Sequence, residues 1–342
     1  MTVFMNDWQN FVARQGLTPD AVAASAGFFA PLTEYGLIAV SGDDAAGFLH
    51  NQLTNDVLQL PIDAARLAGY CTAKGRLLAT MLVWRMGDEI MLMLPGELLA
   101  ATLKRLQMFV LRARVKLRDA SAEYAIVALA GEHANPALAT RLPQLNHTPY
   151  GKTESENGCL ISLPDAADVV RTLWVTPVSQ AIAAWPALQD ALAPAAAASW
   201  QLTEIEAGLP WVTQATQEQF VPQMINFELV GGVNFKKGCY PGQEIVARSQ
   251  YRGTLKRRMV LAEGASASAA GAEVFAAADP DQPAGQVVLS ASLPHPEGGA
   301  RHAALIEVKR ALTDAGELHI GAADGPVVRL RELPYEIPAD AP

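Results

Sequence analysis

The sequence predicts an α+β protein that ends in a small β-barrel. Helix-like and strand-like segments are mixed without regular alternation up to about residue 200, and several short apolar strands divided by turn residues follow after residue 255. A doubly wound parallel sheet would alternate strand and helix instead. With 342 residues, the chain exceeds what one hydrophobic core usually serves, so two or three domains are expected.

The first elements are expected to be a helix and an antiparallel meander. Phe48, Leu49 and Leu53 have near-helical spacing, which predicts a helix within residues 44–60 after Ser41 as a cap. A turn at Asn55 and Asp56 follows it. The expected elements after that are strands at 68–72, 77–84 and 89–94, a helix at 98–110 and a strand at 114–117.

A second unit is expected from Glu123, and the barrel after a basic segment. The second unit has expected strands at 124–129, 159–163 and 173–176, a helix at 134–141, a surface helix in the alanine-rich residues 187–198 and a helical run at 200–208. The expected barrel strands are 259–262, 274–275, 286–290, 302–308 and 327–330. The domain limits predicted from this order are 1–120, completed by about 200–250, then 121–199, then 255–331.

Composition restricts the class of protein. Half of the residues are apolar and 18% are charged, which supports a folded core and argues against global disorder. The first residues lack the features of a leader, and no apolar run approaches the length of a spanning helix, so a cytoplasmic location is expected. The net charge of −9 disfavours broad nonspecific binding to nucleic acid. A local basic region can still attract an anionic ligand.

Three cysteines are widely separated in the chain. Cys71, Cys159 and Cys239 form no disulfide framework, and none has a Cys-x-x-Cys partner, so no metal site is predicted. Cys239 differs from the others because it lies between lysines and a Pro-Gly turn. Residues 236–258 carry seven basic residues, Lys236, Lys237, Arg248, Arg252, Lys256, Arg257 and Arg258, against the single acid Glu244.

This basic segment is a candidate site for thiol chemistry. A thiolate is favoured beside lysines and at the start of a helix, and Lys237 precedes Cys239 while residues 243–251 could open a short helix or form a strand. Cys239 and Lys237 are therefore the candidate catalytic residues. The alternative is that Cys239 is a small buried hydrophobe beside an ordinary solvated basic face.

Four segments together resemble one known family. They are FLHNQLTNDV (48–57), AKGRLLATMLV (73–83), EIEAGLPWV (204–212) and KKGCYPGQE (236–244). The chain is similar to the folate-binding YgfZ/Iba57 family, which is related to the glycine cleavage T-protein, a tetrahydrofolate-dependent aminomethyltransferase. The resemblance implies a three-domain T-protein-like ring, tetrahydrofolate or a derivative as cofactor, and a role in assembling or repairing iron–sulfur proteins, including an enzyme that modifies tRNA.

The resemblance also implies roles for individual residues. Glu206 would recognise the pterin edge, because a carboxylate can accept two hydrogen bonds from it. The other expected folate contacts are amides at Gln52 and Asn55, stacking surfaces at Trp84 and Trp211, and Arg248 for the glutamate tail. Each has a structural alternative: a turn at Asn55, plain core for the tryptophans, a solvated basic strip for the arginine. Motif support is expected from Gly238, Tyr240, Gly242, Gln243 and Glu244, the last two also as helix caps.

One departure from the T-protein bears on the reaction. Ala79 and Thr80 stand where the T-protein has an acidic pair, and neither can act as a carboxylate. An aminomethyl or other one-carbon transferase is therefore the alternative function, and an RNA-contacting regulator that uses residues 236–258 is a second alternative. The expected partners are folate, iron–sulfur assembly proteins or client enzymes, and transient RNA, with no membrane. No role is predicted for any of the six histidines.

Overall fold

The computed structural model describes residues 6–18, 27–132, 146–251, 255–294, 299–313 and 316–338. The chain divides into two compact units. Unit 1 comprises residues 1–46, 59–66 and 82–200, and unit 2 comprises residues 47–58, 67–81 and 201–342. Unit 2 therefore combines three of the four family-like segments, and residues 73–81 of the fourth, with the C-terminal barrel.

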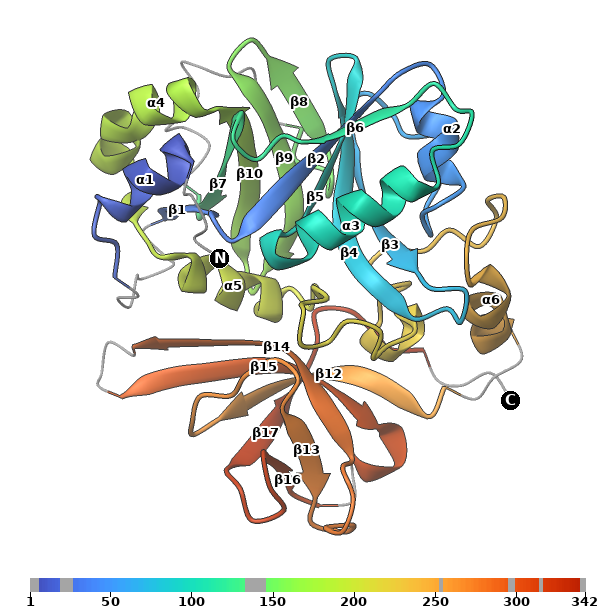
Figure 1. The fold of residues 1–342 in the computed structure, drawn as a ribbon. Coiled ribbons are helices and arrows are strands. Elements are labelled where there is room, and N and C mark those ends of the chain that lie inside the picture. The colour runs from blue at the N-terminus through green and yellow to red at the C-terminus, as the bar shows by residue number, and fades with distance from the viewer. Residues whose placement is uncertain are drawn as a thin grey trace. The chain divides into compact units, whose positions relative to one another are not determined.

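Unit 1 contains a six-stranded sheet covered by two helices (Figure 1). Helix α1 (Asp7–Ala13) begins with a capping box at Asn6, and it contacts α4 (Val178–Ala191). Trp8, Phe29 and Trp185 pack edge to face in the core beneath them. The sheet order is β11 (Ala193–Pro194), β1 (Phe28–Pro31), β7 (Tyr124–Ala130), β10 (Val169–Pro177), β9 (Gly158–Ala166) and β8 (Lys152–Ser155).

A second sheet has five strands. Its order is β3 (Ala65–Cys71), β4 (Leu77–Met86), β5 (Glu89–Pro95), β2 (Tyr35–Ser41) and β6 (Lys116–Asp119), and β3 and β4 each carry residues of both units. Helix α2 (Ala45–His50) follows β2, and α3 (Gly96–Met108) follows β5. Leu98, Leu99 and Leu106 are the large apolar residues that α3 buries, which is the amphipathic face expected for this helix.

Unit 2 ends in a closed barrel. The strands follow one another around it in the order β12 (Arg257–Gly264), β15 (Ala300–Lys309), β14 (Gly285–Pro294), β13 (Glu273–Ala276), β16 (Leu318–Ile320) and β17 (Val327–Arg331). The barrel core includes Val274, Val287, Ile306 and Leu318. Outside the barrel lie α5 (Ala197–Glu206), which starts in unit 1, α6 (Gln243–Tyr251) and the 3₁₀ turns η3 (Pro222–Ile225) and η4 (Arg310–Leu312).

The mixed fold and the barrel confirm the predicted class, and several elements need correction. The helix expected within 44–60 is only Ala45–His50, and Ser41 ends strand β2 instead of capping a helix. Residues 187–198 are not one helix: α4 ends at Ala191 because Ala193 and Pro194 pair with β1, and proline lacks the N–H that a helix interior needs. Elements α1, β1, β2, β8 and β16 were not predicted from the sequence. The helix expected at 134–141 lies outside the described residues, and the predicted domain limits remain predictions.

None of the described helices is both long and apolar enough to cross a membrane.

Candidate functional site

The loop around Cys239 packs closely against a hairpin turn in unit 2. Gly242 has φ +81°, and a Cβ built there would lie 2.4 Å from Thr72 O and 2.6 Å from Gly75 N. The turn Thr72–Gly75 joins β3 to β4, and α6 begins at Gln243, directly after the glycine. Only glycine combines this φ with so close an approach. The Lys74-Gly75 and Pro241-Gly242 turns therefore pack against each other. Of the two expected conformations for residues 243–251, helix or strand, the structure has the helix.

Lys237 anchors the loop to the end of α2. Its side chain is buried, and its Nζ donates hydrogen bonds to His50 O and, at 2.7 Å, to Leu53 O. These carbonyls lie where a helix leaves acceptors without partners. The same ammonium lies 4.8 Å from the centroid of the Tyr240 ring, a cation–π distance. Lys237 thus ties the segments 48–57 and 236–244 together.

Burial lowers the pKa of Lys237 to about 8, while the charges of Asp56 and Cys239 oppose that change. The hydrogens of the Lys237 ammonium are directed to the His50 and Leu53 carbonyls. Lys237 therefore acts on Cys239 by its positive charge and not by a hydrogen bond. Burial also raises the pKa of the Tyr240 phenol. Tyr240 is therefore neutral and supports the lysine by its ring.

Cys239 is exposed, whereas Cys71 and Cys159 are buried. This excludes the alternative in which Cys239 is a small core residue. Burial raises the pKa of Cys71 and of Cys159 to about 12, so neither offers a thiolate at neutral pH. Cys239 is the accessible thiol of the three.

His50 is a site residue that the sequence reasoning missed. Its Nδ1 lies 3.0 Å from Asp56 Oδ1, and its side chain is largely buried. A Cβ at Gly238 would lie 3.3 Å from His50 Nε2, so the backbone beside Cys239 runs along the imidazole edge. The glycine before the cysteine was the available signal, because it permits this approach.

The amides of the first segment have different surroundings. Asn55 Nδ2 donates to Leu67 O and to Gly231 O, both at 2.7 Å, and Asn55 Oδ1 accepts from Asp56 N. Both amide hydrogens are thus engaged, which supports the structural alternative, and an amide contact of Asn55 with folate stays a prediction. Gln52 Oε1 is buried and has no hydrogen-bond partner in the described structure. It is an acceptor that a bound donor could satisfy.

Glu206 ends α5 beside the barrel. Its Oε1 accepts from Arg301 Nη2 at 2.5 Å and from Arg331 Nη1 at 2.9 Å. Both arginines also approach Glu263, at 3.2 and 3.9 Å. A hollow of about 630 Å³ is lined by Arg331, Tyr335 and neighbouring residues, and Tyr335 Oη donates to Gly208 O at 2.9 Å. Glu206 therefore lies near a hollow that is large enough for a cofactor.

The remaining predicted site residues are dispersed. Trp84 is fully buried in β4 and offers no surface to a folate ring, which corrects that expectation. Trp211 is nearly buried, and its Nε1 donates to Glu204 Oε1 at 2.8 Å. Arg248 and Glu244 lie exposed on α6, near its half-buried first residue Gln243. The contacts of Trp211 and Arg248 with folate remain predictions.

The basic strip is less exposed than its composition predicts. Arg258 is buried against Glu228, Arg257 pairs with Glu307 at 2.8 Å, and Lys237 is buried as described. Arg252 lies outside the described residues. The strip therefore presents fewer free charges to RNA than the sequence suggested. Thr80, at the position where the resemblance to the T-protein implies an acid, is buried and accepts from Val212 N at 2.9 Å.

Comparison with known proteins finds the same family as the four sequence segments indicated. The GCVT N-terminal domain family matches residues 6–230. The tRNA-modifying protein YgfZ of Yersinia pseudotuberculosis serotype IB (strain PB1/+) is 31% identical over 237 residues, which cover 68% of this chain and 70% of that protein. The chain belongs to the YgfZ family of GCVT-domain proteins. The YgfZ of Yersinia pestis (strain Pestoides F) is 30% identical with the same coverage.

The T-protein-like fold of this YgfZ-family chain is confirmed by a solved structure. The glycine cleavage system aminomethyltransferase T from Bartonella henselae superposes with a TM-score of 0.72 at 18% identity, covering 89% of this chain and 84% of that one. At this identity the likeness concerns the fold.

Proposed function

We propose that this YgfZ-family protein binds tetrahydrofolate or a derivative and acts as an accessory factor in the assembly or repair of iron–sulfur clusters, with consequences for tRNA modification. The exposed thiol of Cys239 carries the proposal, because it is held in a loop that three of the four family-like segments build. Its relatives are named tRNA-modifying proteins, which supports the link to tRNA.

Two acceptors of the described structure suit a folate. Glu206 Oε2 retains acceptor capacity beside the two arginines on Oε1, and Gln52 Oε1 is a buried acceptor without a partner. The pterin edge would donate to Glu206. Tetrahydrofolate would supply the capacity to carry a one-carbon group, while Lys237 would hold positive charge near the Cys239 thiol. A transferase is less well supported, because the buried Thr80 provides no acid or base.

Calorimetric titration with tetrahydrofolate tests the folate half of the proposal. Wild type is expected to bind saturably, and Glu206→Ala to bind about 10- to 100-fold more weakly, because a charge-assisted hydrogen bond is lost. Glu263→Ala is the matched control, since it belongs to the same arginine network and is not assigned to the pterin. If Glu263→Ala weakened folate binding as much as Glu206→Ala does, the loss would come from disturbing Arg301 and Arg331 and not from a lost pterin contact. No binding to folded wild type would contradict the folate site.

The role of the Cys239 thiol is tested by measuring tRNA thiolation in cells that lack the endogenous protein and express a variant instead. Cys239→Ala is expected to abolish restoration of tRNA thiolation while keeping the folate affinity and melting temperature of wild type, because the side chain is exposed. Lys236→Ala, an exposed neighbour, is the control and is expected to restore thiolation. Mass spectrometry of digested tRNA gives the measurement. Full restoration by Cys239→Ala would show that the thiol has no part in the function.

A further inference from the structure

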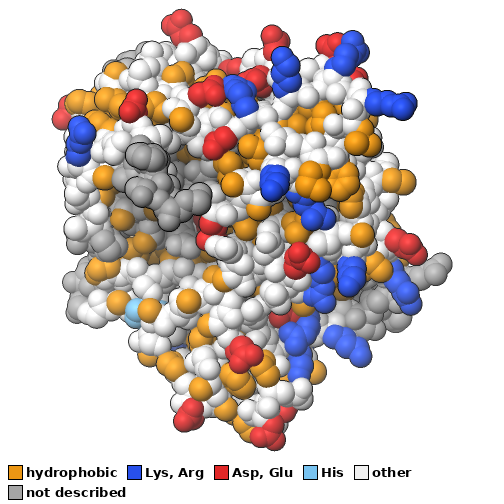
Figure 2. Space-filling model, in the orientation of Figure 1, with side chains coloured by type: hydrophobic (Ala, Val, Ile, Leu, Met, Phe, Trp, Pro, Cys, Tyr) orange, Lys and Arg blue, Asp and Glu red, His pale blue; other side chains and the backbone are white. Residues whose placement is uncertain are grey.

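Unit 1 carries a second basic segment, between the last turns of α3 and strand β6. Residues 104–118 contain six lysines and arginines and no aspartate or glutamate. Three large apolar side chains within it are exposed: Met108 to 67%, Phe109 to 45% and Leu111 to 86%. On the face that Figure 2 shows, which carries α3, hydrophobic side chains lie among lysines and arginines. We call Lys104, Met108, Phe109, Leu111, Arg112 and Lys116 the α3 patch.

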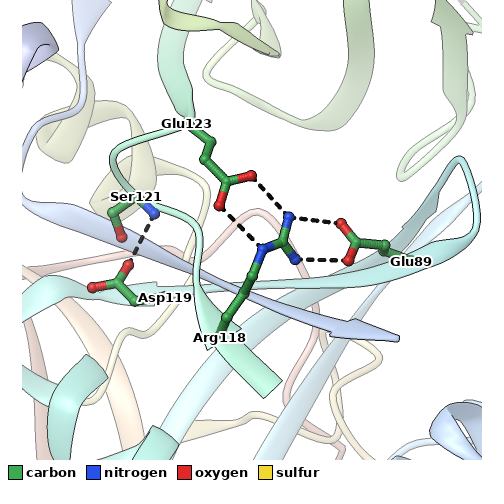
Figure 3. Close-up of polar contacts among 5 residues, drawn as sticks. All are labelled: Glu89, Arg118, Asp119, Ser121 and Glu123. Atoms are coloured by element: carbon green, nitrogen blue, oxygen red, sulfur yellow. Dashed lines mark hydrogen bonds and ion pairs between the residues drawn. The ribbon is translucent and has the colours of Figure 1, made fainter. Parts of the chain in front are cut away.

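Two basic residues of the segment are already neutralised. Figure 3 shows Arg118 between Glu89 and Glu123. Its Nη1 lies 2.6 Å from Glu89 Oε1, and its Nη2 lies 2.8 Å from Glu123 Oε2. These hydrogen bonds raise the pKa of Arg118, which therefore stays charged and paired. Arg114 lies 2.9 Å from Asp43. Both arginines are thus paired with carboxylates of the same chain.

The three basic residues of the α3 patch form no such ion pair with the described residues. Lys104, Arg112 and Lys116 are all exposed. They surround the three apolar side chains in sequence, on both sides. An apolar centre with a charged rim is the anatomy of a protein interface, and Met, Phe and Arg are enriched there. Single exposed apolar residues are ordinary, but three within four consecutive positions, each with this exposure, are typical of an interaction surface.

We propose that the α3 patch docks a partner protein whose surface presents an apolar pocket bordered by aspartate and glutamate. A second copy of this chain is disfavoured, because a two-fold interface would oppose the positive rim to itself. RNA would pair with the rim and could stack on Phe109, but it offers no aliphatic pocket for Leu111. The inference goes beyond the proposed function, since the patch belongs to unit 1 and shares no residue with the folate and thiol site.

Selection from a random peptide library displayed on phage tests the chemistry of the partner. Wild type is the bait, and enriched sequences are expected to combine aliphatic or aromatic residues with Asp and Glu. Binding of the synthesised peptides is expected to fall about tenfold or more with Leu111→Glu, because the apolar anchor is lost and a like charge is introduced. Lys104→Glu with Arg112→Glu is expected to weaken binding and to reverse its salt dependence, because like charges then face the acidic peptides.

Ile62→Glu is the matched control, because Ile62 is exposed to 72% in the same unit but lies outside the patch. It is expected to bind the peptides as wild type does. Peptides without acidic residues, absence of enrichment, or equal loss with Ile62→Glu would overturn the proposal. So would stronger binding to bulk tRNA or to phosphatidylglycerol vesicles that depends on Leu111 and Arg112, since it would assign the patch to RNA or to a lipid surface.

Discussion

Arg258→Met is expected to lower the free energy of unfolding by about 3–5 kcal/mol, the range for breaking a buried ion pair by removing one partner. Arg258 Nη1 lies 2.5 Å from Glu228 Oε1 and donates to Gln223 O at 2.9 Å, and the two side chains are only 5% and 4% exposed. The substitution leaves the Glu228 carboxylate buried without its counter-charge. Urea denaturation at neutral pH measures the loss.

The pH dependence of this loss follows from Glu228. Burial raises the pKa of Glu228 above its usual value, and Arg258 opposes that change. Without the arginine the pKa of the folded state rises further, so the folded variant binds a proton at a higher pH than the unfolded chain does. The deficit of Arg258→Met should therefore shrink as the pH falls toward the ordinary carboxyl range and be largest above it.

Arg114→Met provides the control for the ion-pair argument. Its pair with Asp43 also has a short distance of 2.9 Å, but the side chains are 73% and 72% exposed, so a loss within about 1 kcal/mol is expected. Replacing both Arg258 and Glu228 by methionine should recover part of the stability, because no buried charge remains. Equal losses for Arg258→Met and Arg114→Met would contradict the buried pair.

Gly242→Ala is expected to lower the free energy of unfolding by about 2–4 kcal/mol, from a left-handed φ and a steric clash together. The new Cβ would lie 2.4 Å from Thr72 O, which is backbone and has no rotamer to relieve the contact. The start of α6 must then move away from the β3–β4 turn. Because Cys239 lies three residues before Gly242, its rate of alkylation by iodoacetamide should change as well.

Gly87→Ala separates the two causes. Gly87 also has a positive φ, +55°, but a Cβ there would meet nothing within 4 Å, so only the backbone preference of about 1–2 kcal/mol is lost. Its Cys239 alkylation should equal that of wild type. A Gly242→Ala protein as stable as Gly87→Ala, with unchanged alkylation, would show that the two turns do not pack as described.

The local elements of the fold were largely determined by the sequence. Turn residues and apolar periodicity act over a few positions, so they predicted the β3–β4 turn and five of the six barrel strands, and they gave the limits of α6 while leaving helix or strand open there. The same local reasoning failed at residues 187–198. There, pairing of Ala193 and Pro194 with β1 overrides a strong helical preference.

The composition of the site was decided by contacts between residues far apart in the chain. Lys237 was predicted beside Cys239 from their spacing, but its hydrogen bonds to His50 O and Leu53 O, 187 and 184 residues away, show that it holds the loop. The approach of Gly238 to His50 and the burial of Trp84 are equally nonlocal. Sequence spacing reports which groups are available, whereas burial and hydrogen-bond partners depend on which distant segments the folded backbone brings together.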